Sequence, residues 1–136
     1  MGKSPSIGSV IATASDAAEA FREAVKMAGK EEGFFVLPLD ASGKMLAAPE
    51  MVALGYTDGT TGFNAGAVFR AALTKGAQAL IVAHNHPSGD LKPSKADIAA
   101  TAELRDLAKR MDVDFIDHII LGAGDAFLSL SELADD

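Results

Sequence analysis

The stretch AHNHPSGDLKPSKAD, residues 83–97, gathers side chains that can bind a metal ion. His84 ends the apolar run QALIVAH, His86 follows two residues later, and Asp97 follows after a polar loop; the two histidines are two of the three in the chain. Alternate side chains of a strand lie on one face, so both imidazoles are expected to converge while Asn85 points away. Two imidazoles and one carboxylate leave a fourth position for water on a tetrahedral Zn²⁺, which is typical of a catalytic site rather than a structural one.

The spacing of Ser94 and Asp97 is also that of an ordinary helix N-terminus, where a capping hydroxyl precedes an acidic residue in the first turn. Most such pairs in proteins are only caps, and paired histidines also occur without a metal. Because a side chain in the first turn points back toward the helix N-terminus, the carboxylate of Asp97 can still reach the histidines. The combination of His-x-His with Ser-x-x-Asp therefore favours a metal site over either simpler interpretation.

Three helices are predicted around this loop from apolar residues at helical spacing. Their expected ranges are about 17–28, 65–75 and 94–111. We expect Asp16 and Glu19 to form a capping pair for the first helix, and Gly29 to end it. Asn64 is expected to cap the second helix. The inward-facing residues of the third helix are expected to be Ala100, Leu104, Leu107 and Met111.

Apolar runs between turn residues predict the strands. Their expected ranges are 34–39, part of 45–54, 78–84, 113–122 and 125–132, with a Gly- and Thr-rich loop at 55–63. The run at 78–84 is of the kind that is buried on both faces of a sheet. Together these elements indicate one mixed α/β domain, residues 15–136, in which about three helices flank a sheet, after a flexible or extended segment at 1–14.

The composition narrows the classes of function. The net charge of the 136 residues is −7, and the 12 basic residues are scattered, so direct nucleic-acid binding is not expected. There is no cysteine, which excludes disulfides and thiolate metal sites and leaves nitrogen and oxygen ligands. No apolar run approaches the ~20 residues of a membrane-spanning helix, and no signal peptide begins the chain. These features predict a cytoplasmic protein without a membrane partner.

The motif HNHPSGDLKPSKAD resembles the metal-binding signature (the JAMM motif) of the JAB/MPN metallopeptidase superfamily. Its HNHPSGD wording is similar to the RadC branch, and the likeness extends over roughly residues 31–131. The segments that carry it, in the RadC-like order, are EEGFFVLPLD, VFRAAL, ALIVAHNHPSGD, PSKAD and DHIILG. The resemblance implies a JAB/MPN-like, cytidine-deaminase-like fold, in which a mixed sheet is flanked by helices.

The resemblance also implies roles for individual residues. His84, His86 and Asp97 correspond to the ligands of one Zn²⁺ per chain, and Ser94 to the hydroxyl that stabilises the oxyanion. The implied reaction is the hydrolysis of an amide or isopeptide bond, in a peptide or a protein conjugate, by metal-activated water. A His₂Asp site also accepts other divalent ions.

A glutamate just before an early strand serves as general base in the superfamily, and Glu32 matches that position. Glu31 is the alternative if the register differs by one residue. Taken without the motif, Glu32 is an exposed charge at the start of a strand. With the motif, it is the carboxylate that takes a proton and passes it to the leaving group, without itself binding the metal.

Other polar residues near the motif have two interpretations each. His118, which follows Asp117 in an apolar strand, is either a satisfied, partly buried histidine or a partner of the metal ligands. Asn85 and Ser88 are expected to hold the loop through backbone hydrogen bonds. Asp90 either does the same or contacts substrate.

The sequence departs from the RadC pattern in two places. Ala65, Gly66 and Ala67 stand where related chains carry the tripeptide PRE, which leaves substrate preference and a partner contact open. The helix-hairpin-helix region of the larger family members, associated with DNA, has no counterpart here, which suggests an isolated domain or a single-domain relative.

Three hypotheses about function follow. The first is an active zinc hydrolase, a peptidase or isopeptidase. The second is a binding module associated with DNA repair, in which the metal is structural. The third is a metal-free scaffold, which the intact His-x-His and Ser-x-x-Asp disfavour. Metal content separates the third hypothesis from the others.

Overall fold

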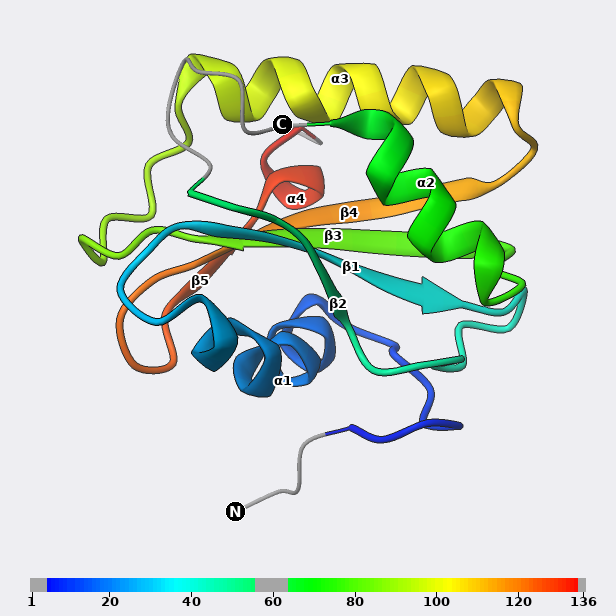
Figure 1. Cartoon of the computed structure of the whole chain (residues 1–136), viewed down its shortest axis with the longest axis horizontal. Coiled ribbons are helices and arrows are strands. Elements are labelled where there is room, and N and C mark those ends of the chain that lie inside the picture. The colour runs from blue at the N-terminus through cyan, green and yellow to red at the C-terminus, as the bar shows by residue number, and fades with distance from the viewer. Residues whose placement is uncertain (1–4, 56–63, 135–136) are drawn as a thin grey trace.

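The computed structural model describes residues 5–55 and 64–134, and in this part of the chain five strands form one mixed sheet (Figure 1). The strands are β1 Gly33–Leu39, β2 Glu50–Leu54, β3 Ala79–Asn85, β4 Asp114–Leu121 and β5 Phe127–Ser129. The helices are α1 Ala14–Val25, α2 Ala65–Thr74, α3 Lys95–Arg110 and α4 Leu130–Ala134, with a 3₁₀ turn, η1, at Lys26–Ala28. The predicted α/β architecture is confirmed.

The strand order is β2-β1-β3-β4-β5, and among these described strands only β3 and β4 pair in parallel. Parallel neighbours require a crossover, which α3 supplies. Because α3 must run back along the sheet to reach the start of β4, its N-terminus lies at the carboxyl end of β3 (Figure 1). This connection places the start of α3 beside His84, near the end of β3, and His86, which directly follows the strand.

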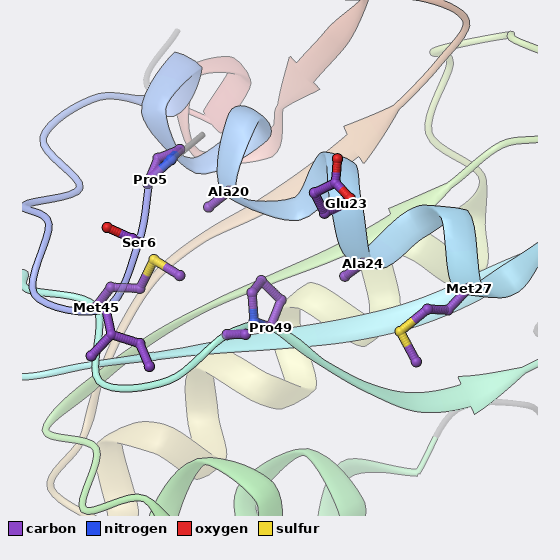
Figure 2. A pocket seen from close by; sticks show the side chains of 10 residues that line it. Pro5, Ser6, Ala20, Glu23, Ala24, Met27, Met45 and Pro49 are labelled. Carbon is purple, nitrogen blue, oxygen red and sulfur yellow. The ribbon is translucent and has the colours of Figure 1, made fainter. Parts of the chain in front are cut away.

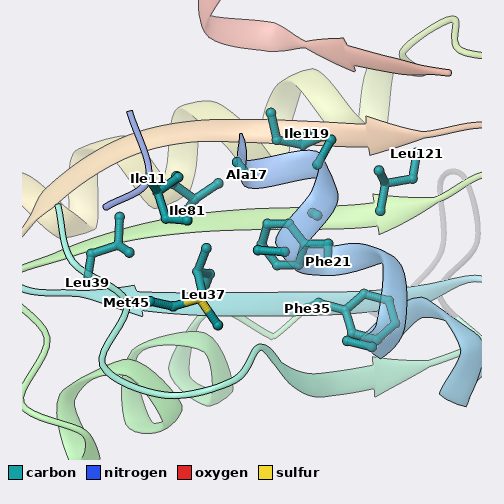
Figure 3. Close-up of a cluster of buried hydrophobic side chains, with 14 of the residues drawn as sticks. Ile11, Ala17, Phe21, Phe35, Leu37, Leu39, Met45, Ile81, Ile119 and Leu121 are labelled. Atoms are coloured by element: carbon teal, nitrogen blue, oxygen red, sulfur yellow. The ribbon is translucent and has the colours of Figure 1, made fainter. Parts of the chain in front are cut away.

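Two interior strands of the sheet, β1 and β3, are buried along their whole length. Alternate residues serve two different cores. On one face, α1 packs through Phe21 against Phe35, Leu37 and Ile81 (Figure 3). On the other face, α2 and α3 cover a second core. Its members include Phe34, Val36, Val68, Leu80, Val82 and Leu104. His84 lies on the same face of β3 as Leu80 and Val82, so it lies under α3.

The start of α1 differs from the prediction. Asp16 and Glu19 do not form the capping pair; Thr13 is the N-cap, and its Oγ1 accepts a hydrogen bond of 3.0 Å from the backbone N–H of Asp16. The N-cap must be extended, and Thr13 has φ −133° and ψ 164°. Gly29, with φ 63°, ends η1 as expected for a residue that tolerates the left-handed region.

Two other predictions, one about a helix and one about a strand, are corrected. Met111 is 45% exposed because it is the C-cap of α3, and Ala108 is buried in its place. The strand predicted at 125–132 covers only Phe127–Ser129, since Leu130 begins α4. Asp117 stabilises this change of direction by accepting hydrogen bonds from the Ser129 hydroxyl and the Ser131 N–H.

The start of α2 and the position of β2 agree with the predictions from the sequence. Asn64 caps α2, with its Oδ1 accepting from the Ala67 N–H, so the residues in place of PRE form the first turn of this helix. The strand expected within 45–54 is β2, and most of the predicted loop at 55–63 lies outside the described residues. Within residues 5–55 and 64–134, none of the helices has the length and apolar composition needed to span a bilayer.

An apolar groove lies on the α1 side of the sheet, between α1, the segment before it and the segment leading to β2 (Figure 2). Its lining residues include Pro5, Ala20, Glu23, Met27, Met45 and Pro49. Among the described residues that line the groove, Glu23 is the one ionisable side chain, so these residues offer no set of metal ligands.

Candidate metal centre

The structure brings together the three residues predicted as metal ligands. The Nε2 atoms of His84 and His86 are 2.8 Å apart. The carboxylate of Asp97 faces both rings, with Oδ1 3.1 Å from Nε2 of His84 and Oδ2 3.4 Å from Nε2 of His86. His84 and Asp97 are buried, while the His86 side chain keeps 14% exposure, so the site opens on the side of His86.

A second carboxylate stands farther from the same rings. Oε2 of Glu32 is 3.9 Å from Nε2 of His84 and 3.9 Å from Nε2 of His86. The ligand atoms of Glu32, His84 and His86 all lie within 4.8 Å of one another, so this trio could also hold a metal ion. Glu31, the alternative in the sequence, is exposed and is not part of this cluster. The imidazole pair is thus flanked by one carboxylate at contact distance and one at a longer distance.

Asp97 is fixed by a capping box at the start of α3. The Ser94 hydroxyl oxygen accepts from the Asp97 N–H at 3.0 Å, and Oδ2 of Asp97 accepts from the Ser94 N–H at 2.8 Å. These two bonds satisfy N–H groups that the helix cannot pair itself. The prediction that Ser94 caps the helix is confirmed, and the cap aims the carboxylate at the histidines.

The loop between the histidines and α3 is held by its own side chains. Nδ1 of His86 donates to the Asp90 carbonyl at 2.6 Å, the Asp90 carboxylate accepts from the Lys92 N–H, and the Ser88 hydroxyl accepts from the Asp90 N–H. Asp90 therefore holds the loop, which is one of the two interpretations given above. At Gly122 an added Cβ would lie 2.9 Å from the backbone carbonyl oxygen of Gly89, so a glycine here lets the loop pack this closely.

Asn85 acts differently from the prediction. Its side chain lies on the opposite face of β3, where Oδ1 accepts from the Gly33 N–H at 2.8 Å and Nδ2 donates to the Glu31 carbonyl at 3.0 Å. It therefore holds the start of β1 rather than its own loop. The Glu32 carbonyl, between these two groups, accepts from the Gly55 N–H at 2.8 Å. This backbone network fixes the segment that carries the Glu32 carboxylate.

His118 lies directly behind His84. Its Nε2 is 2.8 Å from Nδ1 of His84, and its Nδ1 is 2.6 Å from the Thr101 hydroxyl oxygen. His118 is fully buried, not partly buried as the sequence suggested, and the Phe34 ring packs near both imidazoles. Of the two interpretations of His118, contact with a proposed metal ligand is the one observed. Thr101 was not predicted from the sequence, although its position four residues after Asp97 on the same helix face could have indicated it.

The environment sets the protonation of these groups. Burial lowers the pKa of His84, and it lowers the pKa of His118 still more clearly. The hydrogen bond to Asp97 raises the pKa of His86. Burial acts to raise the pKa of Asp97, but contacts with His84 and His86 outweigh it and hold the pKa below its ordinary value. The site therefore favours a carboxylate together with neutral imidazole at the buried ring.

These donors fit a small divalent cation. Two imidazole nitrogens and a carboxylate are the ligand types of zinc and related metals, and they already face one point. The ring nitrogens turned away from that point contact a backbone carbonyl and a second imidazole, as the outer nitrogens of metal-binding histidines do. The described residues therefore form a cluster of donors that could hold one metal ion.

Known proteins are similar to this chain over most of its length. The family model described as RadC-like JAB domain matches residues 11–135. The UPF0758 protein of Thermosynechococcus vestitus is 38% identical over 102 residues, covering 75% of this chain and 40% of that protein. A UPF0758 protein of Clostridium perfringens is 32% identical over 122 residues, covering 90% of this chain and 52% of that protein.

The chain spans about half the length, or less, of these curated relatives. A UPF0758 protein of Carboxydothermus hydrogenoformans is 41% identical over 93 residues, which are 68% of this chain and 40% of the relative. The matched family region includes every strand of the sheet and all the residues of the candidate centre. The chain belongs to the RadC-like JAB domain family.

Proposed function

We propose that this domain is a zinc-dependent hydrolase of the JAMM type that cleaves an amide or isopeptide bond in a peptide or a protein conjugate. The observation that carries the proposal is the unequal spacing of two carboxylates around one imidazole pair. Asp97 lies 3.1 and 3.4 Å from the two Nε2 atoms, whereas Glu32 lies 3.9 Å from both. The nearer carboxylate suits a metal ligand, and the farther one suits a base that acts through a water molecule.

Each residue then has a separate part in the reaction. His84, His86 and Asp97 would hold Zn²⁺, which when bound lowers the pKa of water and polarises a carbonyl oxygen. Glu32 takes a proton from the attacking water as the water oxygen bonds to the carbonyl carbon. Glu32 then gives this proton to the leaving nitrogen as the carbon–nitrogen bond breaks, so it is unchanged at the end of the cycle.

Ser94 supports the same reaction from the start of α3. Its oxygen already accepts the Asp97 N–H, so its hydroxyl hydrogen can be donated to the substrate carbonyl oxygen as negative charge develops there. The substrate is proposed to be a peptide or protein rather than a nucleic acid, because the net charge of −7 repels phosphate.

Glu32→Gln tests the proposal, with Glu31→Gln as its matched control. We expect the Glu32 variant to lose about 10²–10⁴-fold in kcat against internally quenched peptide and isopeptide-linked substrate libraries. The control should keep wild-type activity, and both variants should keep one zinc per chain by elemental analysis of protein purified without a metal-affinity step. A similar loss in both variants, or a wild-type chain that takes up no zinc, would contradict the proposal.

A further inference from the structure

Two hydrogen-bonded chains run from backbone carbonyls to the candidate metal centre. The first joins the Asp97 carbonyl to Thr101, then to His118 and then to His84, with distances of 3.0, 2.6 and 2.8 Å. The second joins the Asp90 carbonyl to Nδ1 of His86 at 2.6 Å. Neutral imidazole carries one N–H and one lone pair, so each chain constrains the proton positions along it.

The shorter hydrogen-bonded chain sets the proton position of His86 directly. A carbonyl oxygen can only accept a hydrogen bond, so the proton of neutral His86 lies on Nδ1. In this neutral form, which is the form that can bind a metal, Nε2 presents a lone pair to the centre, whereas a second proton on Nε2 makes the hydrogen bond to Asp97 that raises the pKa of His86.

The longer hydrogen-bonded chain sets the proton position of His84 through two intermediate groups, Thr101 and His118. Thr101 has one hydroxyl hydrogen, and the Asp97 carbonyl at 3.0 Å takes it. The Thr101 oxygen therefore accepts from Nδ1–H of His118, whose Nε2 is left as an acceptor for Nδ1–H of His84. Nε2 of His84 then also presents a lone pair, and this nitrogen lies 2.8 Å from Nε2 of His86.

We propose that Thr101 and His118 are positioning residues, which hold His84 in the tautomer whose Nε2 lone pair faces the metal. The proposal rests on the metal centre of the proposed function and adds how its most buried ligand is prepared. Two nitrogen lone pairs and the Asp97 carboxylate repel one another unless a cation lies among them, so the relay favours metal binding over the empty state. The opposite arrangement, with a proton on Nε2 of His84, would block the ligand position.

Thr101→Val tests the relay because it keeps the shape of the side chain and removes the hydroxyl. Without that oxygen, Nδ1–H of His118 has lost its acceptor in a buried site, and the arrangement that binds metal becomes costly. We expect zinc affinity, measured by competition with a chromophoric chelator, to fall about 10–100-fold, the range for partners of metal-binding histidines. Thr101→Ser restores the hydroxyl and should return the affinity to within a few-fold of wild type.

Thr74→Val is a matched control on α2. The Thr74 hydroxyl donates to the Arg70 carbonyl one turn earlier, which is the same helix contact that Thr101 makes. Among the described residues, no histidine contacts the Thr74 hydroxyl. Its zinc affinity should equal that of the wild type. Equal zinc affinity of the Thr101→Val and wild-type chains would overturn the relay.

The tautomers can also be observed directly. Long-range ¹H–¹⁵N correlation spectra of the ¹⁵N-labelled wild-type chain, with and without zinc, should show the protons of His84 and His118 on Nδ1. A proton on Nε2 of His84 would overturn the relay even if the variants fold poorly. A wild-type chain with these tautomers but no zinc affinity would instead refute the proposed function and leave the relay standing.

Discussion

Helices α1 and α3 begin with the same local structure and put it to different uses. Thr13 and Asp16 form a capping box at α1, and Ser94 and Asp97 form one at α3. In each box the hydroxyl accepts from the acidic residue's N–H at 3.0 Å, and the carboxylate accepts from the N-cap N–H. As helix caps, the two boxes therefore make the same pair of hydrogen bonds.

The difference lies in what the carboxylate meets beyond the cap. Oδ2 of Asp16 accepts a second backbone N–H, that of Ala12, at 3.0 Å. Asp97 is 1% exposed, and its oxygens face His84 and His86 instead. A capping box always points a carboxylate back past the helix start. Whether that carboxylate is only a cap or also a ligand depends on which segment the fold places there.

Asp97→Asn and Asp16→Asn separate the two uses most strongly. Each change leaves an amide oxygen that can still cap, but only Asp97→Asn removes a negatively charged oxygen that faces the histidines. Zinc affinity measured by chelator competition should fall by more than about 100-fold in the Asp97 variant, beyond the range for outer partners of metal ligands. The Asp16 variant should bind zinc as the wild type does. Comparable affinities in the two variants would show that the boxes do not differ in function.

Zinc should also stabilise the folded chain. This stabilisation should depend on the capping box at α3 and not on the box at α1. At free zinc about 100 times the Kd, binding contributes about 2.7 kcal/mol, which raises the Tm by roughly 10 °C for a domain of this size. Thermal unfolding followed by circular dichroism should show this rise for the wild type and the Asp16→Asn chain. An equal rise in Asp97→Asn would mean that zinc binds elsewhere.

Ser94→Ala and Thr13→Ala give the smallest and most similar effects on stability. Each removes one capping hydroxyl and should lower the free energy of unfolding by about 1 kcal/mol, as measured by urea denaturation. Peptide hydrolysis should fall in the Ser94 variant alone, because only that hydroxyl is proposed to contact substrate. Full activity of the Ser94 variant would limit this residue to the role that Thr13 has.

The fold was predicted best where a local pattern is sufficient. Fully apolar runs identified the central strands, and Asn64 identified the start of α2, because burial and capping leave direct marks in the sequence. The last strand was predicted too long, since the turn into α4 depends on Asp117, which lies in another strand. The cap of α1 was misplaced because acidic pairs at helical spacing occur both at the N-cap and inside the first turn.

The sequence by itself determined the donor types and their local geometry. The two-residue period of a strand puts His84 and His86 on one face, and a capping box aims the side chain of Asp97 backward. The family motif added Glu32 and the nature of the metal as expectations. These features depend only on neighbours along the chain, so they can be read without the fold.

Only the tertiary structure decided which groups meet. The return of α3 along the sheet brings Asp97 to the histidines, and the pairing of β3 with β4 sets His118 behind His84. The 3.9 Å spacing of Glu32 depends on a separate strand, whose start Asn85 holds from the opposite face. Contacts between distant segments follow from strand register and helix packing, and no local pattern in the sequence records either one.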